Sequence, residues 1–213
     1  MRCLVACLLA CSMLSGVDEA VEPAPAPILL LSYQAFAGRG VNGSETVGTD
    51  LADEHVGGHR VVHVSLPVVW GEPEAQVPGL IAEHQPVLVL GLGEGFPNRI
   101  AVEQRAVNRR DYPDERGDAP PAQQVDPAGP ASRESRWQFD PAAFTDHGIA
   151  VVASSDAGTY LCNNLLYTSL ASDCPIVGFV HLPPQGTLPA DAYRSLCSPV
   201  IRKLITTNLP ASP

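Results

Sequence analysis

The sequence has few basic residues. Its 13 Lys and Arg stand against 23 Asp and Glu, which gives a formal net charge of −10 at pH 7. Such a surface would repel nucleic-acid phosphates, so the composition argues against a nucleic-acid partner. Long apolar runs are also missing: beyond the N-terminus no stretch approaches the roughly 18 residues that would span a membrane. With 45% hydrophobic and 17% charged residues, the 213-residue chain is typical of one packed domain.

Cysteine is scarce once the N-terminus is set aside. Six cysteines occur, of which Cys3, Cys7 and Cys11 lie at the N-terminus, and Cys162, Cys174 and Cys197 remain for the domain. An odd number leaves at least one thiol unpaired in a monomer. Cys174 and Cys197 could pair in an oxidising compartment if their geometry allows it, which would leave Cys162 free. No His and Cys cluster has metal-ligand spacing, so we predict no metal or organic cofactor.

Residues 1–20 have the pattern of an export signal. One positive charge precedes a short apolar run that ends in small residues, MRCLVACLLACSMLSG. Within it, the tetrapeptide LLAC resembles a bacterial lipoprotein cleavage box, in which Cys11 would become a lipidated first residue. An ordinary secretory signal cut before Val21 is the alternative. Residues 21–27 are acidic and proline-rich, as in a flexible tether. We therefore expect an exported protein that is periplasmic, secreted or lipid-anchored.

Short apolar runs rich in β-branched residues alternate with helix-length segments along the rest of the chain. Predicted strands cover residues 28–33, 60–68, 86–93, 148–155 and 175–183, and predicted helices cover 72–85, 162–172 and 190–207. Apolar strands that alternate with helices indicate a mostly parallel sheet covered on both faces. We therefore predict one α/β domain over residues 28–213, a three-layer α/β/α sandwich. Residues 112–136, dense in Pro, Ala, Gly and charge, are expected to form a long surface loop or a partly disordered insert.

Cys162 lies where a strand turns into a helix, in GIAVVASSDAGTYLCNNLLYTSL. The unpaired N–H groups and the dipole at a helix N-terminus favour an anion, so a thiol there is biased toward the thiolate. Turns at the carboxyl edge of a parallel sheet also hold the sites of α/β folds. A buried, inert cysteine that only packs the first helical turn is nevertheless the commoner case, and position alone does not select the reactive thiolate.

A thiolate nucleophile needs an imidazole that takes and returns its proton. His181 is the candidate because it closes the apolar run IVGFV, at the sheet edge where Cys162 is expected. The other histidines are predicted to be exposed in loops or structural: His55, His59, His63, His84 and His147. A carboxylate would orient the imidazole. Glu103 is a lone acid in the β-prone run NRIAVEQRAVN, although a surface ion pair with a neighbouring arginine would also account for it.

Several separated motifs, in the family's order, resemble those of pyroglutamyl-peptidase I, a family of cysteine peptidases that remove N-terminal pyroglutamate. AGTYLCN matches the nucleophile motif at Cys162, and GFVHLPP matches the histidine motif at His181. IAVEQRAVN is similar to the segment that carries the glutamate, which falls on Glu103. YQAFAGRGVNGS, at residues 33–44, resembles the family's N-terminal loop. The resemblance runs over nearly the whole chain after the export signal.

The resemblance implies an acyl-enzyme mechanism. Cys162 would attack the pyroglutamyl carbonyl, His181 would transfer the proton, and Glu103 would hold the imidazolium. Backbone N–H groups around the helix start would stabilise the oxyanion. Positions carried over to substrate binding are Tyr33, Phe36, Asn42, Tyr160 and Leu161. The implied partner is a peptide with N-terminal pyroglutamate, without a cofactor, and a dimer or tetramer is the assembly known in the family.

The chain departs from the family around the expected pocket. Ser32-Tyr33 replaces the usual Gly-Phe, and GLGEGFPNR carries Glu94 and Phe96 where family members tend to have Gly-Gly-Arg. None of these departures removes a catalytic group, and all of them bear on substrate choice, rate or assembly. A second hypothesis therefore stands beside the peptidase: a catalytically silent exported relative that acts as an envelope binding or interaction protein.

Overall fold

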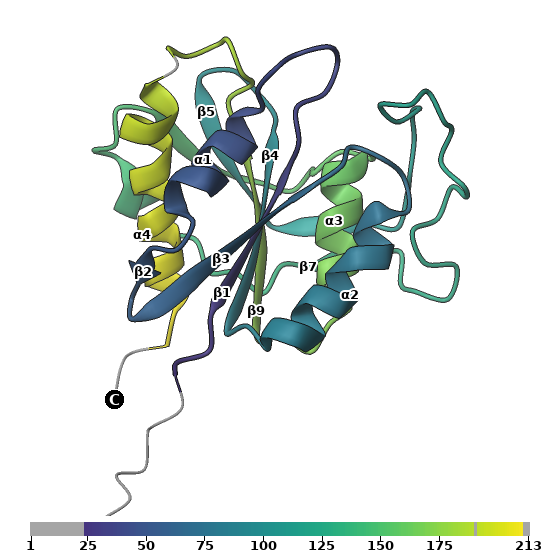
Figure 1. Cartoon of the computed structure of the whole chain (residues 1–213), viewed down its shortest axis with the longest axis horizontal. Helices are drawn as coiled ribbons and strands as arrows, with labels where there is room; N and C mark the ends of the chain where they lie inside the picture. Colours follow the sequence, from purple (N-terminus) through teal and green to yellow (C-terminus); the bar gives the residue numbers. More distant parts are fainter. Residues whose placement is uncertain (1–23, 190, 211–213) are drawn as a thin grey trace, which may run out of the picture.

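A central sheet organises the chain. In the computed structural model, which describes residues 24–189 and 191–210, seven strands follow one another across this sheet (Figure 1). Their spatial order is β2 (His55–Val56), β3 (His59–Leu66), β1 (Ile28–Tyr33), β4 (Leu88–Glu94), β9 (Ile176–Leu182), β5 (Arg99–Glu103) and β8 (Ala150–Ser154). The predicted export signal, residues 1–20, lies outside the described residues. Ala26 and Pro27, at the end of the predicted tether, already bond to the domain through their carbonyl oxygens.

Helices cover both faces of the sheet. Helices α1 (Gly43–Leu51) and α4 (Ser198–Asn208) lie on one face, and α2 (Glu72–His84) and α3 (Leu161–Ser169) lie on the other (Figure 1). Each face buries its own apolar cluster against its own helices. The central strands β1 and β4 are buried almost throughout, because helices pack on both of their sides. The predicted three-layer α/β/α fold is confirmed.

The sheet is parallel except at two places. Strand β1 pairs in parallel with β3 and β4, and β4 pairs in parallel with β9. Strand β5 then runs antiparallel to β9 and parallel to β8, and β2 forms a short antiparallel edge beside β3. The antiparallel pairing of β9 with β5 determines which of their side chains face each other at the candidate site.

Two helical segments differ from expectation. Helix α1 was not predicted, because its sequence GSETVGTDL holds two glycines and few apolar residues. Its start is fixed by Asn42, whose Oδ1 accepts the Ser44 N–H at 2.9 Å. The single helix predicted over 190–207 is divided into a π-helical turn, Tyr193–Cys197, and α4. Pro199 follows that turn and has no N–H to give to a regular helical bond.

The proline-rich segment 112–136 runs over the side of the molecule that carries α2 and α3 (Figure 1). It holds one short strand, β7 (Ser132–Glu134), which pairs with β6 (Arg105–Val107). Asp114 anchors its start: the carboxylate is nearly buried and accepts the Trp70 N–H at 3.0 Å. The Tyr167 hydroxyl of α3 donates to the Pro130 carbonyl at 2.7 Å and holds its far part. Side chains of the domain therefore hold this segment at both ends.

The three cysteines of the domain are all free thiols. Cys174 packs in the cluster beneath α2 and α3, whereas Cys197 packs on the opposite face of the sheet. They therefore cannot form the disulfide considered above. Burial raises the pKa of the Cys174 thiol, and it raises the pKa of Cys197 to about 12. Both thiols are buried, whereas Cys162, the third cysteine of the domain, is partly exposed.

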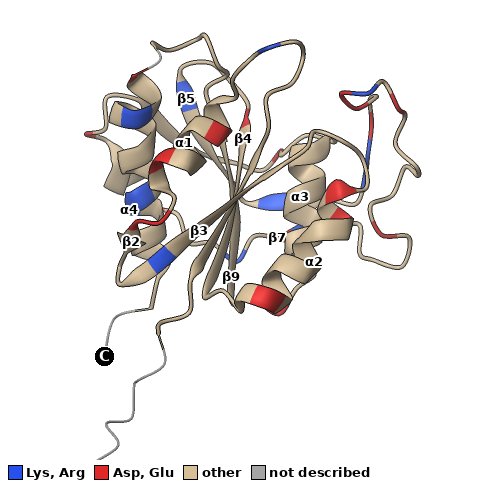
Figure 2. Ribbon diagram, viewed as in Figure 1, with Lys and Arg blue, Asp and Glu red and all other residues tan. Residues whose placement is uncertain are grey.

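Charged residues of both signs occur on the helices and loops of the two outer layers (Figure 2). Acidic residues lie at both ends of α2, whereas α4 carries Arg202 and Lys203. Arg202 makes an ion pair with Glu54 at 2.7 Å, which ties α4 to the turn before β2. Among the described residues, no helix has the length and apolar character needed to cross a membrane.

Candidate active site

His181 and Glu103 face each other across the antiparallel pair β9 and β5. His181 lies directly opposite Ala101, and Glu103 lies opposite Phe179. Because side chains alternate along a strand, His181 and Glu103 are diagonal neighbours on one face of the sheet. The imidazole Nδ1 donates to Glu103 Oε1 at 2.8 Å, and the two residues are 7% and 0% exposed. Glu103 is therefore no surface ion-pair partner: it fixes the ring and leaves Nε2 for the nucleophile.

The charge of His181 follows from its neighbours. Burial alone would lower its pKa, but the Cys162 sulfur and the Glu103 carboxylate outweigh burial and raise the pKa from 6.5 to about 10. Within the described residues, Glu103 Oε2 has no hydrogen-bond partner, so the imidazole is the carboxylate's main source of stabilisation. At neutral pH the imidazole therefore stays protonated and holds the proton that acyl transfer must deliver to a leaving group.

Cys162 is the second residue of α3 and reaches the same place from the neighbouring layer. Its sulfur lies near the imidazole, because its charge is the main influence that raises the pKa of His181. Room for the sulfur comes from Gly93 of β4: a Cβ at that position would lie 2.6 Å from Cys162 Sγ. Gly95 makes room for His181 in the same way, since its Cβ would lie 2.6 Å from the histidine Cβ. The glycines of GLGEG therefore admit the nucleophile and the base.

The Asn163 side chain holds the start of α3 in place through hydrogen bonds. Its Oδ1 accepts the Val107 N–H at 2.8 Å, and its Nδ2 donates to the carbonyls of Val107 and Arg109 at 2.8 and 3.1 Å. These bonds tie the nucleophile helix to β6, directly after the strand that carries Glu103. The first N–H groups of a helix have no partner within the helix, so the groups around Cys162 are available as hydrogen-bond donors.

A small cavity of about 70 Å³ opens beside Cys162. Every residue predicted to bind substrate lines it: Tyr33, Phe36, Asn42, Tyr160 and Leu161. Tyr33 is buried, its hydroxyl donates to the Leu161 carbonyl at 2.6 Å, and burial raises its pKa well above the usual range. Its added hydroxyl is therefore satisfied by the nucleophile helix, and its ring forms an apolar wall. Tyr160 packs edge-on against Trp70 at 5.4 Å.

Two residues that line the cavity, and several that hold Cys162 and His181 in place, were not predicted from the sequence. Val68 and Glu94 also line the cavity. Glu94 was noted only as a departure from the family, and Asn163 and Phe179 were not singled out. Phe179 packs edge-on against His181 with 5.0 Å between ring centres. The consecutive amides in CNNLLYTSL, two polar residues in an apolar helix, were the signal available for Asn163.

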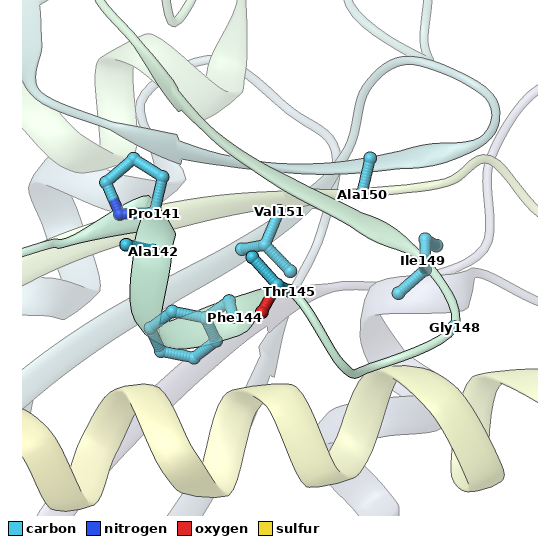
Figure 3. A pocket seen from close by; sticks show the side chains of 8 residues that line it. All are labelled: Pro141, Ala142, Phe144, Thr145, Gly148, Ile149, Ala150 and Val151. Carbon is cyan, nitrogen blue, oxygen red and sulfur yellow. The ribbon is translucent and has the colours of Figure 1, made fainter.

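A wider groove of about 590 Å³ lies elsewhere, between the turn Pro141–Phe144 and the start of β8 (Figure 3). Its walls are apolar or small, with Phe144, Ile149 and Val151 among them, and they carry no titratable side chain. It therefore has no nucleophile or base. Among the described residues, no group of three or more His, Cys, Asp or Glu side chains could hold a metal ion.

A sequence model of the pyroglutamyl peptidase family matches residues 26–203. The chain belongs to the pyroglutamyl peptidase family. The pyrrolidone-carboxylate peptidase of Escherichia fergusonii is 32% identical over 193 residues, which cover 85% of this chain and 90% of that protein. That of Yersinia pestis is 32% identical over 166 residues, 73% of this chain and 77% of that protein.

Solved structures of other pyroglutamyl peptidases share the fold. A mutant pyrrolidone carboxyl peptidase from Pyrococcus furiosus superposes with a TM-score of 0.77 at 24% identity, covering 85% of this chain and 97% of its own. Pyroglutamyl peptidase I from Bacillus amyloliquefaciens gives a TM-score of 0.76 at 23% identity, covering 86% and 96%. The three-layer architecture is therefore that of the family.

Substituting Gly93 by Ala tests the packing around the nucleophile. The added Cβ would displace the sulfur, and displacement of about 1 Å is enough to slow a positioned group by roughly tenfold or more. We expect alkylation of Cys162 by iodoacetamide, followed by mass spectrometry, to slow by that amount. Gly79→Ala is the matched control, because nothing lies within 4 Å of its Cβ. Equal rates in both variants would contradict the proposed contact.

The raised pKa of His181 predicts how the imidazole titrates. In NMR spectra of the ring, His181 should remain protonated through neutral pH and titrate near 10. A raised folded-state pKa stabilises the fold fully below the unfolded value of 6.5, and this stabilisation is lost as the pH rises through about 10. In Glu103→Gln the titration should move downward, because the negative charge is gone. A wild-type titration near 6.5 would contradict the ion-pair description.

Proposed function

We propose that this protein is a cysteine peptidase that removes N-terminal pyroglutamate from peptides. The observation that carries the proposal is the meeting of Cys162, His181 and Glu103 beside a small cavity with aromatic walls. A nucleophile, a proton carrier and an orienting carboxylate are the groups that acyl transfer requires. Membership of the pyroglutamyl peptidase family supports the choice of substrate.

The reaction proceeds in two balanced steps. The Cys162 sulfur forms a bond to the pyroglutamyl carbonyl carbon, the C–N bond breaks, and the leaving amine takes the proton held by His181. Water then attacks the thioester, and His181 takes one of its protons. Pyroglutamate leaves, and the sulfur regains the state in which it began. Glu103 keeps its hydrogen bond to Nδ1 and holds the imidazole in place through both steps.

Substrate selection rests on the walls of the cavity. A lactam ring is nearly flat and uncharged, so it packs against the Tyr33 and Phe36 side chains better than a charged amino terminus would. An N-terminal ammonium group would have to give up its hydration against these rings. The cavity is small, which favours one ring over a longer side chain.

Removal of the nucleophile or of the base tests the proposal. Cys162→Ala and His181→Ala should each lower kcat/KM for a fluorogenic pyroglutamyl amide by at least about 1,000-fold under reducing conditions, because the triad acts as a unit. Glu103→Gln should retain more activity than either, since the imidazole keeps a hydrogen-bond partner. The control is Cys174→Ala, which alters a buried thiol just before the start of β9, whereas His181 lies near the end of that strand, and it should leave kcat/KM within about twofold. Unchanged turnover in both Cys162→Ala and His181→Ala would sink the proposal.

We further propose that the enzyme is exported. The support is the sequence pattern of residues 1–20, with its short apolar run ending in small residues. The mass of the mature protein from a bacterial expression host should show that this segment is removed. Cleavage before Cys11 with added lipid mass would indicate a lipoprotein, and cleavage before Val21 an ordinary secreted enzyme. An intact N-terminus on cytosolic protein would overturn export. Size-exclusion chromatography would decide between a monomer and the oligomers of the family.

A further inference from the structure

The loop between β1 and α1, residues 34–42, closes the cavity beside Cys162. Phe36 and Asn42 of this loop form part of the cavity wall. At its tip, Ala37 and Gly38 both adopt positive φ angles, of 56° and 68°. That backbone region is uncommon for a residue with a Cβ, so contacts outside the loop must hold Ala37 there.

Glu94, the last residue of β4, contacts the loop through Arg39. Its side chain is only 4% exposed, although it carries a charge. Oε1 accepts the N–H of Gly43 at 2.7 Å and the N–H of Gln185 at 2.8 Å, and Oε2 lies 2.7 Å from Arg39 Nη1. One nearly buried carboxylate therefore joins three segments: the start of α1, the chain that follows His181, and the β1–α1 loop.

Arg39 contacts both Glu94 and Phe36, and so connects the two residues. The Arg39 guanidinium lies 4.3 Å above the centre of the Phe36 ring. Its Nε and its backbone N both donate to the Phe36 carbonyl, at 3.3 and 3.2 Å. On the other side of the tip, the Glu115 carboxylate accepts the Ala37 N–H at 2.8 Å. Arg39, which is paired with Glu94, therefore packs on the Phe36 ring and holds it in the cavity wall.

We propose that Glu94 is a specificity-determining positioning residue, which through its ion pair with Arg39 clasps Phe36 over the cavity and limits the site to a five-membered lactam. This inference rests on the proposed function, because it concerns how the same site selects its ring. Arg39 is not among the residues that line the cavity, whereas Glu94 is, so Arg39→Met separates the clasp from any direct contact of Glu94 with the ring. Loss of the clasp should therefore weaken ring binding and leave the chemical step in place.

The decisive experiment compares Glu94→Gln and Arg39→Met with the wild type on two fluorogenic amides. One carries the five-membered pyroglutamyl lactam, and the other carries its six-membered homologue. In both variants KM for the pyroglutamyl amide should rise about tenfold, as expected for loss of a hydrogen bond to a charged group, while kcat stays within about threefold. The preference for the five-membered ring should shrink. Arg39→Lys keeps the charge and should recover most of the KM.

Arg99→Met is the matched control. Arg99 also lies over a phenylalanine, at 4.1 Å from the ring centre of Phe96, but neither residue lines the cavity. Its kinetics should equal those of the wild type. The double variant Glu94→Gln/Arg39→Met should be no weaker than either single variant, because one ion pair is lost in all three. Thermal unfolding checks the fold of each, and Arg39→Met keeps the test valid if Glu94→Gln is unstable, since Arg39 is on the partly exposed loop.

A second readout separates this inference from the proposed function. The rate at which N-phenylmaleimide alkylates Cys162, divided by the rate for iodoacetamide, reports access past Phe36 without any turnover. The ratio should rise severalfold in Glu94→Gln and Arg39→Met and stay constant in Arg99→Met. A wild type that hydrolyses pyroglutamyl amides while both clasp variants behave like Arg99→Met would overturn the inference and leave the function standing. A wild type without any hydrolysis would overturn the function and the lactam preference, and the alkylation ratio would then decide on the clasp alone.

Discussion

The buried pair of His181 and Glu103 is the constraint on which the rest of the site depends. A carboxylate in a dry core is costly unless a positive charge or hydrogen bonds compensate it, and here the imidazole is the compensating group. The Cys162 sulfur and the Glu103 carboxylate together raise the pKa of His181 to about 10, so the imidazole stays protonated at neutral pH. The geometry comes from the one reversal of direction among the central strands. Antiparallel pairing of β5 with β9 puts the two side chains diagonally on the same face.

The surrounding sequence makes room for this pair and for its nucleophile. Gly93 and Gly95 lie where any side chain would strike Cys162 or His181. The residue between them, Glu94, bonds to Arg39 of the β1–α1 loop and to the first residue of α1. Three consecutive residues at the end of β4 therefore have two separate roles. The glycines permit the chemistry, and the glutamate between them fixes the wall against which the substrate ring packs.

Most of the sheet could be predicted from the sequence, because apolar runs such as ILLLSY and IVGFVHL bury whole strands and leave a clear pattern. Helix α1 could not, since its glycines and sparse apolar residues resemble a turn and its stability comes from the Asn42 cap and packing. Cys162 and His181 were indicated by their places at the ends of elements. Glu103 became recognisable only through the family resemblance, because nothing local distinguishes it from the other acids. Glu103 meets His181 because β5 runs antiparallel to β9, and the residues of β5 do not indicate that direction.

In the proposed mechanism Cys162, activated by His181, forms a covalent bond to the pyroglutamyl group. This bond can be trapped by rapid quenching in acid during turnover of a pyroglutamyl amide, followed by peptide mass spectrometry. We expect the mass of one pyroglutamyl group on the peptide that contains Cys162, and none on those that contain Cys174 or Cys197. Turnover with an acyl group on another residue, or undiminished turnover after Cys162 has been alkylated, would contradict it.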